Sequence, residues 1–451
     1  MYSLRFLLIS ILTISLFIVN GISYTSRYKI EIKEYSDNII EEEEKLRSLS
    51  SNLGKLSLHD QKFYLSPRPT AFINEAFEKH LPNLFIFNAF RIFEYQPRKG
   101  GGNPFLQKFQ DVDWIFIISI ILSFGIIVLT YDGISGEKER GSLRLSISMN
   151  INRWKIILGK YFGVLITIFI PLLVGVILNL LIITNFKSIP LGTDVLVKVL
   201  SSLALSFLYI SSFTFLGLLM SSLTKHSSTS LVSLLLCWAI LVLLIPNMGA
   251  IIISQIHSVP ERGEIIEKIS LVKKEMFENA PEGTWAMEPS NPFRPSHKVR
   301  AETTNKMLQA EMSIRNDYYQ KQLNQLKLAR NLSRISPAAQ FRYANETIIL
   351  GGIIRFEHLK RKLEIYRQIL LEFVKREDAN DPNSPHWINP ESELFFTNKP
   401  VNYEIIPKFK DEIPKGSEQV KNIFIDFSLL IFSNLLLLYL AFIAFLKYDV
   451  R

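Results

Sequence analysis

The sequence predicts an all-α membrane protein with six transmembrane helices and a mainly helical extracytoplasmic domain built from two insertions. Of the 451 residues, 48% are hydrophobic and 21% are charged. A chain with both fractions gathers its apolar residues in blocks, which excludes a soluble enzyme. Six blocks are long enough to cross a bilayer as helices. They cover residues 1–24, 113–131, 161–186, 199–222, 229–253 and 426–446.

The first block has the layout of a signal peptide, because Arg5 precedes an apolar run that ends at Val19. The run is long for a signal peptide, however, and residues 20–23 form a poor cleavage site. We therefore expect this block to remain as the first transmembrane helix.

Charge sets the expected orientation in the membrane. Basic residues outnumber acidic ones in the segment 132–160, between the second and third blocks; they are Lys138, Arg140, Arg144, Arg153, Lys155 and Lys160. By the positive-inside rule this segment belongs in the cytoplasm. Six spans then place both chain ends in the cytoplasm too. Residues 25–111 and 254–424 follow odd-numbered spans, so we expect them to be extracytoplasmic.

The composition of the two insertions narrows the compartment and the partners. Basic and acidic residues nearly balance in each insertion, so nucleic acid is not an expected partner. Cys237, the only cysteine, lies in the fifth block, so the insertions have no disulfides. Domains without disulfides in an oxidising space suit a bacterial envelope better than a eukaryotic cell surface. We expect a multi-pass protein of the bacterial cytoplasmic (inner) membrane.

Both insertions show helical periodicity. In the first, apolar residues follow a 3-4 rhythm that predicts a helical stalk of about 28 residues rising from the first span; they are Ile32, Tyr35, Ile39, Leu46, Leu49, Leu53 and Leu56. In the second, residues 308–326 and 356–373 predict a helical hairpin. Ser336-Pro337 separates its arms, and Gly351-Gly352 marks a hinge. Residues 386–416 are rich in proline and are expected to form loops or short strands.

Motifs of catalysis and of metal binding do not occur in the sequence. It has no phosphate-binding G-x-x-x-x-G-K-[ST] loop and no H-E-x-x-H, C-x-x-C or G-x-S-x-G motif. The seven histidines are scattered, and none has metal-ligand spacing. We therefore expect no enzyme activity, cofactor or metal site in this chain, and energy supplied by a partner.

The segment 132–145, DGISGEKERGSLRL, carries a specific resemblance. Together with Asn152-Arg153 and Leu158-Gly159-Lys160 it resembles the signature of type-2 ABC transporter permeases, with Ser142 where threonine is commoner. The stretch 333–339 (SRISPAA) and the ending 448–451 (YDVR) are similar to a subgroup with large extracytoplasmic insertions, which includes permeases of gliding motility and of copper-enzyme maturation.

The resemblance implies how such a chain works. Two ABC ATPase subunits would bind a short coupling helix between spans two and three, and a second copy or a related permease would complete the membrane part. The implied ATPase-coupling residues are Asp132, Gly136, Glu137, Glu139, Arg140, Gly141, Ser142, Leu143 and Arg144. Apolar contacts are expected from Ile134, Leu143, Leu145 and Ile147. Lys225 and His226 form a second expected cytoplasmic contact.

The function expected from these features is that of a permease subunit of a bacterial ABC exporter or mechanotransmission complex, with a possible envelope partner for the insertions. A different class is a membrane sensor or scaffold whose insertions bind an envelope ligand without an ATPase. An intramembrane enzyme is a third class, but the spans lack the paired ionisable residues that such chemistry needs.

Overall fold

The structure, a computed structural model, describes residues 4–75, 82–92, 112–148, 152–185, 189, 191–286, 293–395, 397–411 and 417–447. The prediction of an all-α protein with six spans is confirmed, since six helical segments of the described chain are long and apolar enough to cross a membrane. They are Leu4–Leu49, Trp114–Glu139, Arg153–Asn185, Thr193–Leu223, Ser227–Ile256 and Ile423–Leu446. The C-terminal motif 448–451 lies outside the described residues.

These spans correspond to the following elements. The first is α1 (Leu4–Leu49), the third α8 (Arg153–Asn185) and the fourth α9 (Thr193–Leu223). The second combines α4 (Trp114–Phe116), the π-helix η2 (Ile117–Leu122), α5 (Ser123–Thr130) and α6 (Ser135–Glu139). The fifth combines α10 (Ser227–Trp238), the π-helix η3 (Ala239–Leu244) and α11 (Ile245–Ile256), and the sixth lies in α16 (Ser417–Leu446).

Close packing joins α1 to α8 inside the bundle. A side chain at Gly175 of α8 would meet the ring of Phe17 at 2.7 Å, so glycine is what lets the two helices approach. Asn179 donates to the backbone oxygen of Phe17 at 2.7 Å and accepts from the indole nitrogen of Trp114 at 3.3 Å. Hydrogen bonds between helices thus satisfy this buried amide.

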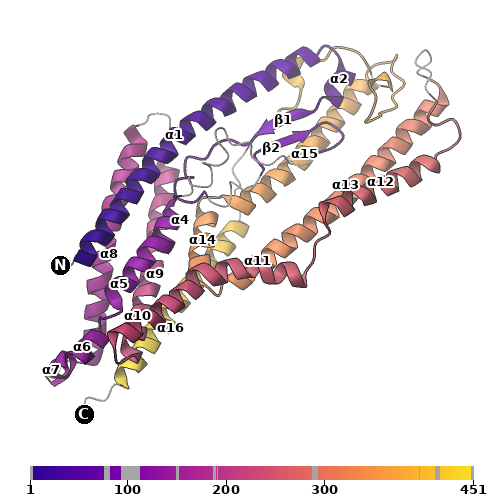
Figure 1. Ribbon diagram of the computed structural model, residues 1–451. Coiled ribbons are helices and arrows are strands. Elements are labelled where there is room, and N and C mark those ends of the chain that lie inside the picture. The colour runs from indigo at the N-terminus through magenta and orange to yellow at the C-terminus, as the bar shows by residue number, and fades with distance from the viewer. Residues whose placement is uncertain are drawn as a thin grey trace.

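The N-terminal end of α1 and the C-terminal end of α16 lie at the same end of the bundle. Arg5 forms an ion pair of 2.9 Å with Asp132, just after α5. Arg153, at the start of α8, donates to the backbone oxygens of Phe445 (3.2 Å) and Leu446 (2.7 Å). An even number of spans places both ends of the chain at the same end of the bundle. Figure 1 shows α6 and the end of α16 together at the lower end of the bundle.

At the opposite end, α1 continues without a break to Leu49, so the helix ends before Leu53 and Leu56, which the predicted stalk included. Asn52 then caps α2 (Leu53–Leu58). The first insertion also contains an antiparallel pair of strands that the helical periodicity did not predict, β1 (Gln61–Tyr64) and β2 (Leu84–Phe87). Their aromatic residues favour strands. Phe85 and Phe87 are buried in one core with Leu363 and Leu370 of α15 (Gly352–Ala379).

The second insertion forms two arms and a short helix that returns to the bundle. The arms are the hairpin of α12 (Arg262–Glu278) with α13 (Pro295–Ser333), and α15. Between α13 and α15 the chain forms α14 (Pro337–Ile348), which packs against α9 and α16 (Figure 1). The expected hairpin of 308–326 with 356–373 is therefore interrupted. Its breaks fall at Ser336-Pro337 and Gly351-Gly352, as the sequence indicates.

Candidate functional site

The segment between the second and third spans turns sharply at Gly141. The chain leaves α5 at Thr130, forms α6, and continues as α7 (Ser142–Ser148). Gly141 has a φ of +73° between the two short helices, a conformation that residues with a side chain rarely adopt. We call residues 135–148 the α6–α7 corner. The third span begins at Arg153, earlier than the expected start at residue 161.

Two of the four apolar residues expected to contact an ATPase face inward instead. Ile134 and Leu143 are fully buried, in a cluster with Ile157 of α8 and Phe445 of α16 among others. Their apolar surface therefore packs the corner against its own bundle. The expectation that Ile134 and Leu143 contact an ATPase is corrected. Leu145 is 68% exposed, so it remains available for an external contact.

Ser221, near the C-terminal end of α9, fixes the turn that leads into α6. Its hydroxyl oxygen accepts from the backbone N–H groups of Ile134 and Ser135, both at 2.9 Å. It also donates to the backbone oxygen of Tyr131 at 2.9 Å. The sequence did not point to Ser221, because a serine at the end of an apolar span carries no pattern of its own.

The charged residues of α6 join the corner to three other helices. Glu137 forms an ion pair of 2.6 Å with Lys160 of α8. Lys138 donates to the backbone oxygen of Thr224 at 3.0 Å, at the C-terminal end of α9. Glu139 accepts from the backbone nitrogen and the hydroxyl of Ser227 at 3.1 and 2.7 Å, at the start of α10.

These contacts also follow the electrostatics of helix ends. A cation at a helix C-terminus and an anion at a helix N-terminus are both favourable, because backbone dipoles leave partial charges there. Lys138 and Glu139 occupy these two positions on α9 and α10.

The opposite face of the corner is exposed and brings the two predicted contact regions together. The exposed residues there are Glu139, Arg140, Gly141, Ser142, Arg144 and Leu145. Lys225 and His226, from the loop between α9 and α10, are exposed beside them. The ring nitrogen Nδ1 of His226 lies 3.3 Å from a carboxylate oxygen of Glu139. Within the described chain, no group of three or more His, Cys, Asp or Glu side chains could hold a metal ion.

The middle and the N-terminal half of α9 contact α14. Ser202 donates to the side-chain oxygen of Asn345 at 2.6 Å, and both residues are buried. The rings of Tyr209 and Phe341 stack with centroids 4.8 Å apart. One helix therefore contacts the α6–α7 corner near its C-terminal end and α14 along its middle and N-terminal half.

Buried ion pairs join α14 and its neighbours. Arg330 of α13 pairs with Glu346 of α14 at 3.1 Å. Arg334, just after α13, holds the fully buried Asp426 of α16 with two hydrogen bonds of 2.6 and 3.3 Å. Isolated charges are costly in such surroundings, so each pair fixes the orientation of the helices that carry it.

The fold and the corner together define a multi-pass membrane protein whose own bundle holds a structured, charged segment at one end. The family of ABC-2 transporter proteins has a family model that matches residues 1–450. The chain belongs to this family and is a permease-type membrane protein. Permeases of this family generally work with ABC ATPase subunits in the membrane. No curated protein matches the chain.

Proposed function

We propose that this chain couples ATP hydrolysis by two partner ATPase subunits to movement of its two insertions. It acts in the bacterial cytoplasmic membrane, as part of an exporter or of a mechanotransmission complex, beside a second copy or a related permease. The α6–α7 corner and both chain ends face the cytoplasm, and the insertions lie on the other side. The chain itself carries no catalytic step.

The observation that supports this proposal best is the two-sided build of the corner. Its outer face exposes Arg140, Arg144 and Leu145, a mixture of charge and apolar surface that suits a protein partner. Its inner face is fixed to α8, α9 and α10 through α6. A partner that pushes on the outer face therefore pushes on three spans at once.

The route from the corner to the insertions runs along α9. This helix has 31 residues and is about 46 Å long at 1.5 Å per residue, enough to cross a membrane. Ser202, in its N-terminal half, and Tyr209, near its middle, contact α14, whose two ends lead into α13 and α15. Displacement of α9 is thus passed to both arms of the second insertion.

A pair of matched substitutions tests the docking role. Leu145→Asp places a charge on the outer face of the corner, whereas Leu271→Asp makes the same change on α12, where the side chain is similarly exposed (68% and 60%). Neither side chain is buried, so both variants should fold. We expect Leu145→Asp to lose the ATPase subunits that co-purify with the full-length protein in mild detergent, and Leu271→Asp to keep them.

The double variant Glu139→Lys/Arg140→Glu is a second probe of the same face. Because Glu139 also caps α10, its loss disturbs the bundle, and the effect on ATPase binding is less specific than that of Leu145→Asp. If wild-type protein brings down no ATPase, or if both leucine variants behave like wild type, the docking role is wrong. The sensor or scaffold function then becomes the better one.

A further inference from the structure

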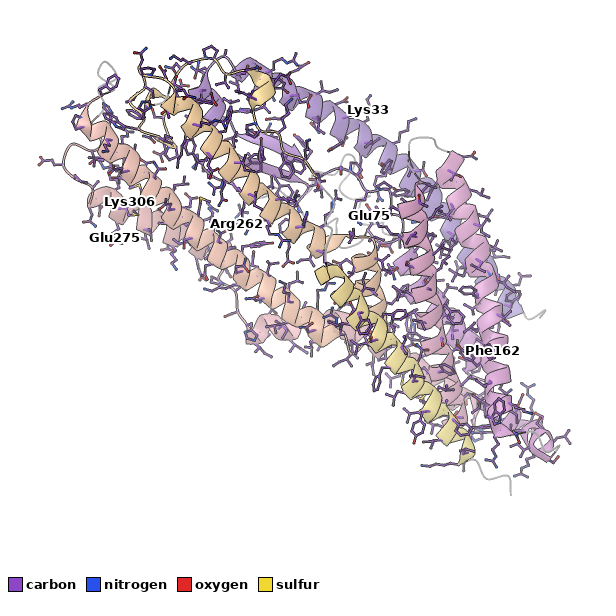
Figure 2. All side chains as sticks on the ribbon, turned by 180° about the vertical axis from the view of Figure 1, so that it is seen from behind. Lys33, Glu75, Phe162, Arg262, Glu275 and Lys306 are labelled. Carbon is purple, nitrogen blue, oxygen red and sulfur yellow. The ribbon has the colours of Figure 1, made fainter. Side chains whose placement is uncertain are left out.

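A pocket lies between the α12–α13 hairpin and α15, far from the α6–α7 corner. It encloses about 590 Å³, within the range of roughly 300–1,000 Å³ that is usual for small-molecule sites. Side chains from all three helices line it, and Pro82 and Ile92 of the first insertion complete the wall. Figure 2 shows Arg262, at the start of α12, in the space between the hairpin and α15.

One part of the lining is apolar. It includes Ile265 and Ile266 of α12, Met312 of α13 and Phe356 of α15. The periodicity of residues 308–326 and 356–373 indicates two apolar helix faces, and the structure places this pocket where they meet. A flexible methionine and aliphatic side chains adapt to an unbranched hydrocarbon chain without fixed hydrogen bonds.

The charges of the lining are one-sided. Its charged members among the described residues are Arg262, Arg315, Lys360, Arg367 and Glu364. Four of these are cations and one is an anion. Arg315 has its own carboxylate partner in Glu311 at 2.8 Å, outside the lining. On α15 the cations Lys360 and Arg367 still outnumber Glu364, so this part of the pocket favours an anionic group.

The two cations of α15 that line the pocket, Lys360 and Arg367, are held in poorly solvated positions. Lys360 lies over the ring of Tyr319, 3.4 Å from its centroid, and 3.5 Å from a carboxylate oxygen of Glu364. Arg367 donates to the backbone oxygen of Phe90 at 3.2 Å. Burial lowers the pKa of both groups, with Glu364 acting in the opposite direction. An anion bound beside them would offset the loss of solvation.

We propose that this pocket binds an amphiphilic anion, with an acyl chain along the apolar lining and a carboxylate or phosphate group beside Lys360 and Arg367. A fatty acid and a membrane phospholipid share this chemistry. The proposal concerns a site separate from the corner and does not depend on ATPase docking, so either can fail without the other.

The test uses full-length protein in nanodiscs of phosphatidylcholine and a hexadecanoate probe that carries a photoreactive diazirine and an alkyne. We expect labelled peptides from α12, α13 and α15, and less labelling when unlabelled hexadecanoate is added. Uncharged hexadecanol should compete poorly. Competition by phosphatidylglycerol in the nanodisc would indicate a membrane lipid as the source, and competition by hexadecanoate alone a free fatty acid.

At Ile266, two substitutions of opposite charge can be compared at a single position of the lining. It is 51% exposed, so a polar substitution there should be tolerated by the fold. We expect Ile266→Glu to reduce labelling roughly five-fold, by repulsion of the anionic group, and Ile266→Lys to preserve it. Equal effects of the two substitutions, equal competition by hexadecanol, or labelling confined to other parts of the chain would overturn the proposal.

Discussion

At the scale of single residues, the turn into the α6–α7 corner depends on Ser221, whose hydroxyl is hydrogen-bonded to backbone groups and to the hydroxyl of Ser135. Ser221 satisfies two backbone N–H groups and one backbone oxygen at the entrance to α6, and it is fully buried. A buried N–H group left without a partner costs about 1–3 kcal/mol. The rigidity of the turn that leads into the α6–α7 corner therefore depends on this hydroxyl.

We expect Ser221→Ala to loosen the corner without unfolding the bundle. Amide hydrogen exchange of residues 131–145 should become faster by roughly ten-fold or more, because about 1.4 kcal/mol of local stability corresponds to each factor of ten. Ser201→Ala is the control on the same helix, since the hydroxyl of the half-buried Ser201 bonds only to the backbone oxygen of Val197 of its own helix in the described structure. Similar exchange in the two variants would show that Ser221 does not hold the turn.

The sequence predicted the α6–α7 corner as an ATPase contact but did not predict the direction in which each of its side chains points. Gly141 turns the chain, and a glycine between two short charged runs favours such a turn by its own residue type. Leu143 and Leu145 look alike in sequence, yet one is fully buried and the other is 68% exposed. The difference depends on where α8, α9 and α16 lie, and local pattern contains no such information.

At the scale of helices, close approach between α5 and α9 depends on Gly217. A side chain there would meet the hydroxyl of Thr130 at 2.0 Å, too short for any atom pair. The two helices must stay close for Ser221 to reach the turn after Thr130. The packing of α5 on α9 thus determines the geometry of the corner.

We predict that Gly217→Ala destabilises the protein by about 1–3 kcal/mol, through overpacking between α5 and α9. The matched control is Gly163→Ala in α8, where a new side chain would meet no atom within 4 Å and alanine is the better helix former. Thermal unfolding in detergent should show a lower midpoint for Gly217→Ala only. A midpoint lowered equally by both substitutions would contradict this account of the helix contact.

Helices were easier to predict than the contacts between them. The six apolar blocks and the breaks at Ser336-Pro337 and Gly351-Gly352 could be identified, because length, hydrophobicity and helix-breaking residues are local properties. The strands β1 and β2 could not, since each has four residues and is stabilised by a partner distant in the sequence. The return of α14 into the bundle was missed for the same reason.

At the scale of the whole molecule, one continuous helix, α9, contacts both the α6–α7 corner and α14. The corner is held near the C-terminal end of α9, and α14 packs against its middle and N-terminal half. The ion pairs Arg330–Glu346 and Arg334–Asp426, each with a buried carboxylate, join α14 and its neighbours to α13 and α16. The pocket between α13 and α15 lies beyond this junction. Motion started at the corner would therefore reach the arms that form the pocket.

The most direct test of this account is photo-crosslinking from the outer face of the corner in native membranes. Benzoylphenylalanine placed at Leu145 keeps that position apolar, and the same residue at Leu271 serves as the control. The account predicts that position 145 forms an adduct with a protein that contains a phosphate-binding ATPase loop, identified by mass spectrometry, and that position 271 does not. An adduct with an unrelated protein, or none from position 145, would contradict it.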